Sequence, residues 1–410
     1  MAIHEPAGLA DRSRLTANLA AVGLLLALVA GVLAWQQPWV SSDGPSATST
    51  IPADARARLA CQFRDLSEAR SRASFVAAAG DSDAARRVAG DIWDARRTLD
   101  VRDVEFTYEG GGEAPDRADG STPAQVEVTW RGGSSMVRFR LMPAADGFEL
   151  LSTAKYGRDQ LPVWLAGRVD VERTTGATVI TIDGGDDDIE AIDLARRAAQ
   201  SVHGLVPAAQ GRLIVVLPAA PATTAAVLGR PLSGVAQIAA VSTALGGSEG
   251  TPAVVLNPRL FGSMDDRAQR VVMTHEATHV LTRIVRKNIE LWVAEGFADY
   301  VALHDDKAPL SVSAGQILRK VKTDGAPTRL PSATDFDEST HGLSTVYEAA
   351  WMIFRMLGEQ HGDSAVRGFY ADVLGGRSVE SAARNRFGTS IARITADWRR
   401  YLTKSASTVS

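Results

Sequence analysis

The sequence has a single cysteine, Cys61, among its 410 residues. No internal disulfide can form, and a zinc site of the CxxC type is excluded because it needs several thiolates. Any bound metal must therefore be held by histidine and carboxylate side chains. The chain also lacks an excess of positive charge, with 44 Lys and Arg against 48 Asp and Glu and a net charge of -4. Without a dense basic block, nucleic acid is not expected as a partner.

The length exceeds that of one typical domain, and 45% of the residues are apolar, which is enough to build hydrophobic cores. We therefore expect two folded units with attached segments. The overall class that the patterns below predict is α+β. No feature of the sequence indicates an oligomeric state.

Residues 15–35, LTANLAAVGLLLALVAGVLAW, contain no charged side chain. Because roughly 20 apolar helical residues cross the hydrocarbon of a bilayer, this segment is predicted to be a transmembrane helix. Arg12 and Arg14 precede it, and no Lys or Arg follows until Arg56. The positive-inside rule then places residues 1–14 in the cytoplasm and the rest of the chain outside the cell.

A cleaved signal peptide is the alternative to an anchor in the cell membrane, because Ala30, Val32 and Ala34 are small residues near the end of the apolar run. Cleavage would give a secreted protein. Residues 36–54 are rich in Ser, Thr and Pro and are predicted to be a linker.

Residues 55–157 are predicted to form a small α+β module. Helical periodicity over ADARARLACQFRDLSEARSRASFVAAAG and DAARRVAGDIWDARRTL predicts two helices. Four alternating runs follow, DVEFTYEG, AQVEVTWRG, SMVRFRLMP and GFELLSTAKY, and predict a curved antiparallel sheet with helices on one face. This order resembles the nuclear-transport-factor-like and SnoaL-like modules, which implies a cone shape. No cluster of His, Asp, Glu and Tyr indicates a ligand site there, so a spacer or docking role is expected.

Residues 158–410 are predicted to form the second domain. Apolar runs such as GRLIVVLP and TPAVVLNP predict buried strands, and three aspartates at 186–188 are interpreted as helix-capping residues rather than metal ligands. A further helix is expected after Ser263, which with Asp266 forms an approximate capping box.

That helix carries His275 and His279, spaced i and i+4, with Glu276 directly after the first histidine. At this spacing both imidazoles project from one face, one turn apart, and can reach a single ion. Glu276 points about a quarter turn away, where it can act on a water without being a ligand. The motif alone leaves two readings open, a catalytic zinc helix or an ordinary helix that carries two histidines.

The next apolar helix, Leu291 to Ala302, favours the catalytic reading. Glu295 and Asp299 are four residues apart and share a face. An antiparallel return after His279 would bring Glu295 beside the histidine pair and complete a two-histidine, one-carboxylate zinc site with an open fourth position. Asp299 would then accept the second ring N–H of a ligand histidine.

The segments HEATH and WVAEGFADY resemble the gluzincin group of zinc metallopeptidases, which includes thermolysin-like enzymes and membrane alanyl aminopeptidases. The resemblance implies a zincin-type domain with a mixed sheet, an active-site helix and a helical C-terminal part. It also implies Zn²⁺ held by His275, His279 and Glu295, with Glu276 as general base and Asp299 as the partner of a ligand histidine. No aminopeptidase Gly-x-Met-Glu-Asn segment lies upstream, which favours the wider peptidase-MA-like set.

Gluzincins often stabilise the oxyanion with a Tyr or His from a later helix. The resemblance implies this role first for Tyr347 and second for His341, although a role for Tyr347 as an ordinary core aromatic stays open. By the same family analogy, the strand at 253–257, AVVLN, is expected at the sheet edge, where an extended peptide could pair.

The sequence therefore predicts a membrane-anchored zinc metallopeptidase that faces outward and hydrolyses a peptide or protein substrate. The alternative is a catalytically inactive, zinc-stabilised binding protein of the cell envelope with the same fold. A third reading has no metal and uses the helix structurally.

Overall fold

A computed structural model describes residues 53–111, 120–145, 147–153, 159–184, 188–246, 250–337 and 342–409. By compactness the chain divides into two units, each assembled from separate stretches of sequence. The sheet unit comprises the described residues of Pro38–Asp193 and Leu213–Leu260, and the helical unit those of Leu194–Arg212 and Phe261–Ser410. The predicted boundary between 55–157 and 158–410 stays a prediction.

The sheet unit begins with three helices, α3 (Ala53–Glu68), α4 (Arg72–Ala79) and α5 (Asp83–Thr98). The prediction of one continuous helix over the first two is wrong, because α3 and α4 are separate helices. Ser71 interrupts it, because its side chain accepts a hydrogen bond from the Ser74 backbone N–H and starts a new helix with a capping box.

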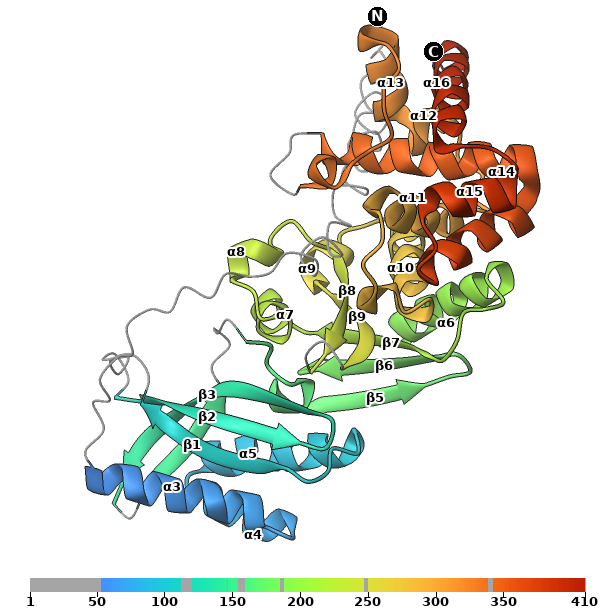
Figure 1. Ribbon diagram of the computed structural model, residues 1–410. Coiled ribbons are helices and arrows are strands. Elements are labelled where there is room, and N and C mark those ends of the chain that lie inside the picture. The colour runs from blue at the N-terminus through green and yellow to red at the C-terminus, as the bar shows by residue number, and fades with distance from the viewer. Residues whose placement is uncertain are drawn as a thin grey trace, which may run out of the picture. The chain divides into compact units, whose positions relative to one another are not determined.

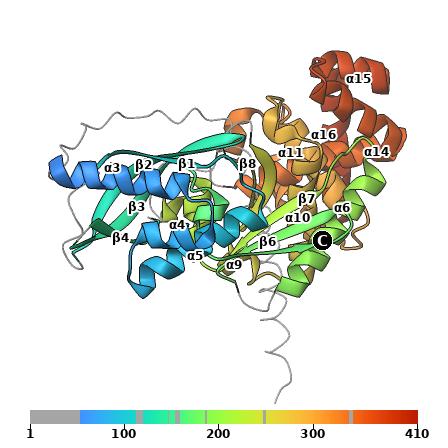
Figure 2. The same cartoon turned by 90° about the horizontal axis from the view of Figure 1, so that it is seen from below.

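Four antiparallel strands follow in sequence order: β1 (Glu105–Gly111), β2 (Thr122–Trp130), β3 (Gly133–Ala144) and β4 (Gly147–Thr153). The three helices lie on one face of this sheet (Figures 1 and 2). Alternate residues point toward them, so that Val126 and Val128 are fully buried on β2.

Aromatic side chains fill the space between these helices and the sheet. The Phe106 ring lies 6.1 to 6.2 Å, centroid to centroid, from those of Phe75, Phe139 and Trp164. The same buried cluster continues to Val216 and Val255 on the second sheet, so the sheet unit has one shared core.

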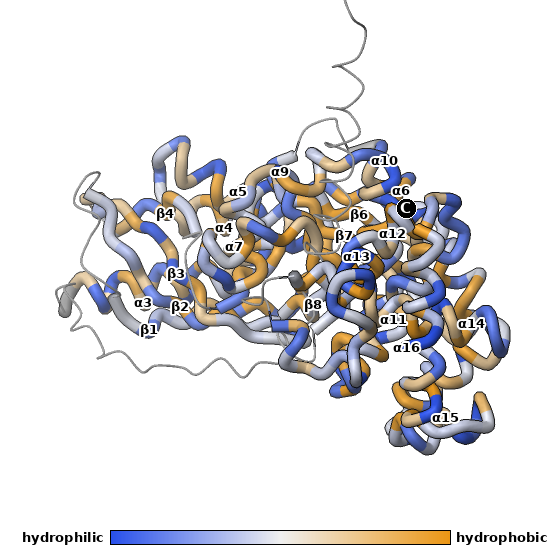
Figure 3. The backbone as a smooth tube through the Cα atoms, turned by 90° about the horizontal axis from the view of Figure 1, so that it is seen from above, coloured by the Kyte–Doolittle hydropathy of each residue, from blue (hydrophilic) through white to orange (hydrophobic). Residues whose placement is uncertain are grey.

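The second sheet contains β5 (Val169–Arg173), β6 (Ala177–Ile182), β7 (Leu213–Pro218), β8 (Ala240–Leu245) and β9 (Thr251–Leu256). Its order is β5-β6-β7-β9-β8, with parallel pairing from β6 through β7 to β9 and antiparallel pairing of both outer strands. Figure 3 shows hydrophobic stretches along β6 and β7. The expected edge position of residues 253–257 is wrong, because β9 pairs on both sides and β8 is the edge strand.

Short helices complete the sheet unit: η1 (Val163–Leu165), α7 (Pro221–Leu228), α8 (Leu232–Val235) and α9 (Pro258–Phe261), the last of which ends at Phe261 in the helical unit. The helical unit contains the larger part of α6 (Asp188–Leu205), then α10 (Asp266–Leu281), η2 (Ile284–Arg286), α11 (Leu291–Ala302), α12 (Leu310–Ser313), α13 (Gly315–Asp324), η3 (Ala333–Phe336), α14 (Leu343–Leu374), α15 (Val379–Phe387) and α16 (Ile391–Thr408). Helix α11 packs against both α10 and α14. The described chain is thus of the mixed α+β class.

The predicted membrane anchor needs correction. The segment 15–35 lies outside the described residues, and among the described helices none is both long and apolar enough to cross a bilayer. Helix α11 is nearly all buried but has only 12 residues, too few for about 30 Å of hydrocarbon. The long α14 carries charges such as Arg355 and Glu359. The predicted single-pass topology, and the localisation deduced from it, are thus not supported by any helix among the described residues.

Candidate metal centre

The N-cap of helix α10 is Asp265, two residues beyond the expected cap at Ser263. The Asp265 carboxylate accepts a hydrogen bond of 2.7 Å from the Ala268 backbone N–H and caps the helix. The helix ends at Leu281, and Arg283 then adopts a left-handed backbone conformation with φ 58°. This turn directs the chain through η2 toward α11.

Both helices of the site are buried along almost their whole length. Every residue from Val271 to Leu281 and from Leu291 to Val301 is buried. Gly296 lets α11 approach α14 closely, because a Cβ there would lie 2.7 Å from the Ala350 carbonyl oxygen and 2.8 Å from Phe354 Cδ2. This packing fixes the position of Glu295, the preceding residue.

Three potential ligand atoms converge between α10 and α11. His275 Nε2 lies 3.0 Å from His279 Nε2 and 3.2 Å from Glu295 Oε2. The third side of the triangle, from His279 Nε2 to Glu295 Oε2, measures 3.5 Å. Ligands of a tetrahedral zinc ion, each about 2.0 to 2.2 Å from the metal, are separated by about 3.3 Å. The spacing of the three atoms therefore fits one zinc ion.

Asp299 defines the tautomer of the first histidine. Its Oδ1 lies 2.7 Å from His275 Nδ1, so the carboxylate accepts the Nδ1–H hydrogen. The Nε2 atom of a neutral His275 then directs its lone pair at His279 and Glu295. Three electron-pair donors facing one another need a positive charge between them, which is the electrostatic requirement of a cation site.

The pKa shifts of the buried ligand residues also indicate that the site needs a positive charge. Burial lowers the pKa of His275, but the Asp299 and Glu295 carboxylates outweigh it and raise the pKa to about 10. Burial raises the pKa of Glu295, but the His279 and His275 rings outweigh it and lower the pKa to about 2. Burial is the main cause of the raised pKa of Asp299. The site favours a proton where a cation is missing.

Several buried polar atoms of the site lack a hydrogen-bond partner in the described part of the chain, and their positions show whether the site suits a metal ion. Glu295 Oε1 and Asp299 Oδ2 have no hydrogen-bond partner within the described ranges. A second carboxylate oxygen beside the ligand triangle is available to a cation, so the donor set fits zinc. His279 Nδ1 also has no hydrogen-bond partner among the described residues. A histidine that binds metal through Nε2 usually donates a hydrogen bond from Nδ1, and His279 differs from His275 in this respect.

The remaining predicted site residues are placed as follows. Glu276 is fully buried on α10. Tyr347, on the first turns of α14, is also fully buried, and its ring centroid lies 6.4 Å from that of His275. His341 lies outside the described residues, as do Asp186 and Asp187. The structure thus brings Tyr347 to the histidine pair, but its predicted role stays a prediction.

Sequence reasoning missed Glu348, the residue after Tyr347. This carboxylate is 1% exposed, and its Oε2 accepts a hydrogen bond of 2.7 Å from the Ile317 backbone N–H at the start of α13. Burial raises the pKa of Glu348 to about 8. A glutamate inside the apolar stretch TVYEAAWMIF was the available signal, because buried carboxylates need partners.

No family model and no curated protein matches the sequence. Two solved structures of a variant M1 zinc metallopeptidase from Deinococcus radiodurans are similar to this chain, each with 12% sequence identity and a TM-score of 0.35. The match to the one with a bound Tyr-Ser-Ala substrate covers 63% of this chain and 58% of that one, and the other match covers 72% and 60%. The chain thus spans about three fifths of the length of those structures. The geometry of the site itself carries the functional conclusion.

Proposed function

We propose that the chain is a zinc metallopeptidase that hydrolyses peptide bonds. The observation that carries the proposal is the triangle of His275 Nε2, His279 Nε2 and Glu295 Oε2, with sides of 3.0, 3.2 and 3.5 Å. Zinc held there would supply a Lewis acid that polarises the scissile carbonyl and acidifies a water molecule.

Glu276 is the general base in this proposal. It follows His275 directly on α10, so helical geometry turns its side chain by about 100° from that ligand. A carboxylate oxygen of Glu276 would take the proton of the attacking water and later pass it to the leaving amine. Asp299 holds the His275 ring in place through the Nδ1 hydrogen bond of 2.7 Å.

Tyr347 is the proposed oxyanion donor. Its ring lies near His275, and its position on the buried face of α14 is fixed by an edge-to-face contact with Phe336, with centroids 5.3 Å apart. A phenolic O–H held on a rigid helix could stabilise the charge that develops on the carbonyl oxygen.

The complete burial of the site favours a second candidate, a zinc-stabilised binding protein without catalysis. His275, Glu276, His279 and Glu295 are all 0% exposed. A structural zinc site is closed, whereas a peptidase must admit a peptide carbonyl to the metal. The same residues would then contribute to stability rather than to hydrolysis.

Metal content and peptide cleavage, measured together on the full-length chain, distinguish the peptidase from the zinc-stabilised binding protein. We expect about one zinc per chain and cleavage within a diverse peptide library. Glu276→Gln should retain the zinc and lower the cleavage rate by at least 100-fold, because the proton acceptor is lost. Zinc retention without cleavage by the unmodified chain would establish the second candidate.

Two variants serve as controls for this experiment. His279→Ala should lose both zinc and cleavage, which shows that cleavage depends on the site. His361→Ala should change neither, because His361 is an exposed residue that contacts Phe387. An empty metal site after zinc supplementation at neutral pH would rule out both candidates.

A further inference from the structure

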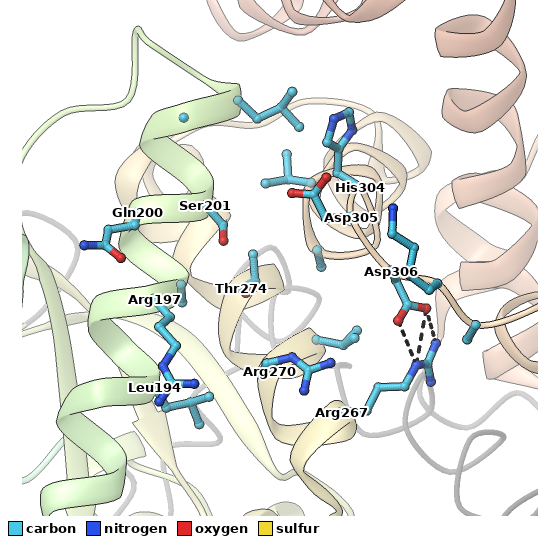
Figure 4. A pocket seen from close by; sticks show the side chains of 18 of the residues that line it. Leu194, Arg197, Gln200, Ser201, Arg267, Arg270, Thr274, His304, Asp305 and Asp306 are labelled. Atoms are coloured by element: carbon cyan, nitrogen blue, oxygen red, sulfur yellow. Dashed lines mark hydrogen bonds and ion pairs between the residues drawn. The ribbon is translucent and has the colours of Figure 1, made fainter.

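A cavity of about 980 Å³ lies in the helical unit. It is bounded by α6, α10 and the segment 301–308 at and after the end of α11 (Figure 4). We call it the α6/α10 pocket. Its volume is at the upper end of the range of about 300 to 1,000 Å³ that is typical of ligand sites.

None of the three metal-ligand residues lines the pocket. Arg267, Arg270, Val271 and Thr274 line it, and their spacing of three and four residues defines one face of α10. At 100° per residue, Glu276 points to the side opposite Arg267. The proposed catalytic base therefore takes no part in the pocket.

Cations outnumber anions in the lining. The cationic side chains are Arg197, Arg267, Arg270, Lys307 and Arg367, and the acidic ones are Asp305, Asp306 and Asp363. Figure 4 shows the Arg197, Arg267 and Arg270 side chains toward one end of the cavity and those of His304 and Asp305 toward the other. The positive charge is thus concentrated at the arginine end.

Two of the three acids are already engaged. Asp306 forms a two-point ion pair with Arg267, with Nη2–Oδ2 at 2.6 Å and Nε–Oδ1 at 3.0 Å, and both side chains are largely buried. Asp363 accepts a hydrogen bond of 2.5 Å from Tyr300 Oη and lies 3.6 Å from His304 Nε2. Because the Arg267–Asp306 pair is neutral overall, four cations of the lining, Arg197, Arg270, Lys307 and Arg367, face the two carboxylates of Asp305 and Asp363.

Three lining cations, Arg270, Lys307 and Arg367, form no ion pair within the described residues, and Arg270 and Lys307 are the two exposed ones. Guanidinium and ammonium groups inside a concave surface attract anions more strongly than on a flat surface, since the low-dielectric walls concentrate the field.

We propose that the α6/α10 pocket binds a small oxyanion with two negative charges, a phosphate or a dicarboxylate. Arg270 would bind two oxygens of the anion through its planar guanidinium, and Lys307 would supply the second charge. The buried Arg267–Asp306 pair forms a fixed wall beside them. The proposal is independent of the peptidase function, because it uses none of the metal ligands.

Isothermal titration of the zinc-loaded, full-length chain with inorganic phosphate and with succinate tests this proposal. Ionic strength is held constant with NaCl, since surface electrostatics depend on salt. Zinc content is measured before and after each titration, so that metal loss is not read as binding. We expect one saturable site per chain, and whichever anion binds more tightly identifies a phosphate or a carboxylate ligand.

Arg270→Gln and Lys307→Gln should each weaken binding about ten-fold or more, as the loss of a charge-assisted hydrogen bond predicts. Arg399→Gln is the matched control, because Arg399 is exposed on α16 and absent from the pocket lining. Thermal melts check that each variant is folded. If Arg270→Gln is unstable, the outcome is decided by Lys307→Gln alone. Absence of saturable binding, binding unaffected by both pocket variants, or equal weakening by Arg399→Gln would overturn the proposal.

Discussion

At the scale of single residues, the hydrogen bond from His275 to Asp299 has the largest influence on the site. It holds the ring with Nδ1 protonated and leaves Nε2 as the ligand atom. The spacing predicted that His275 and His279 share one helix face and that Glu295 and Asp299 share another, because i and i+4 residues lie on the same side of a helix. The meeting of these two faces depended in addition on the expected antiparallel return between the helices. The apolar neighbours of Glu348 indicated that it is buried, but its partner Ile317 could not be predicted, since it is 31 residues away in the sequence.

Asp299→Asn should lower zinc affinity by about 10- to 100-fold, because an amide holds the ligand ring less well than a carboxylate does. Competition with a chelator of known affinity measures the change. Asp305→Asn, an exposed carboxamide substitution after α11, is the control and should retain full affinity. Equal zinc affinity in both variants would mean that Asp299 does not position the ligand.

At the scale of elements, the site depends on the close packing of α11 against α14. Helical periodicity predicted both site helices, but the cap of α10 is Asp265 rather than Ser263. Local patterns cannot decide between two nearby capping residues when the tertiary structure determines where the chain enters the helix. The interior position of β9 escaped prediction for a similar reason, because strand order depends on partners far away in the sequence.

Gly296→Ala should destabilise the fold by about 1 to 3 kcal/mol, because the added methyl group meets the Ala350 carbonyl and the Phe354 ring. Urea unfolding of the metal-free chain measures the free energy. The control is Gly204→Ala on α6, where a Cβ meets nothing within 4 Å. That variant should be neutral or more stable by up to about 1 kcal/mol, since alanine restricts the unfolded chain. Equal losses in the two variants would contradict the packing argument.

At the scale of the whole molecule, stability is linked to pH through buried groups of the helical unit. The pKa of Glu348 is raised from 4.5 to about 8 and that of His275 from 6.5 to about 10. In each case the folded state retains a proton that the unfolded state has lost. The stability that each contributes is complete below the unfolded pKa and disappears as pH rises through the folded pKa.

The metal-free chain should therefore lose stability as pH rises from about 5 to about 10, by an amount on the order of a few kcal/mol per group. Melting temperatures across this range, in the presence of a chelator, measure the loss. Glu348→Gln should flatten the curve between about pH 4.5 and 8, and His275→Gln between about pH 6.5 and 10.

The stabilisation that zinc provides should have the opposite pH dependence and weaken as pH falls. The metal binds only neutral histidines and competes with protons for the same nitrogens. The gain in melting temperature on adding zinc is expected to be largest near neutral pH and to fall as pH decreases through the ordinary histidine range. A gain that stays constant down to pH 5 would contradict ligation by His275 and His279.

The burial of α10 and α11 has a consequence for hydrogen exchange. The runs Val271–Leu281 and Leu291–Val301 have no solvent-facing side, so neither helix can open one turn without exposing core residues to water. Their amide deuterons should therefore exchange only when the helical unit unfolds as a whole, and at nearly the same rate. Exchange at the exposed Asp266, the first residue of α10, should be faster, because this end of the helix can open locally without unfolding of the whole unit.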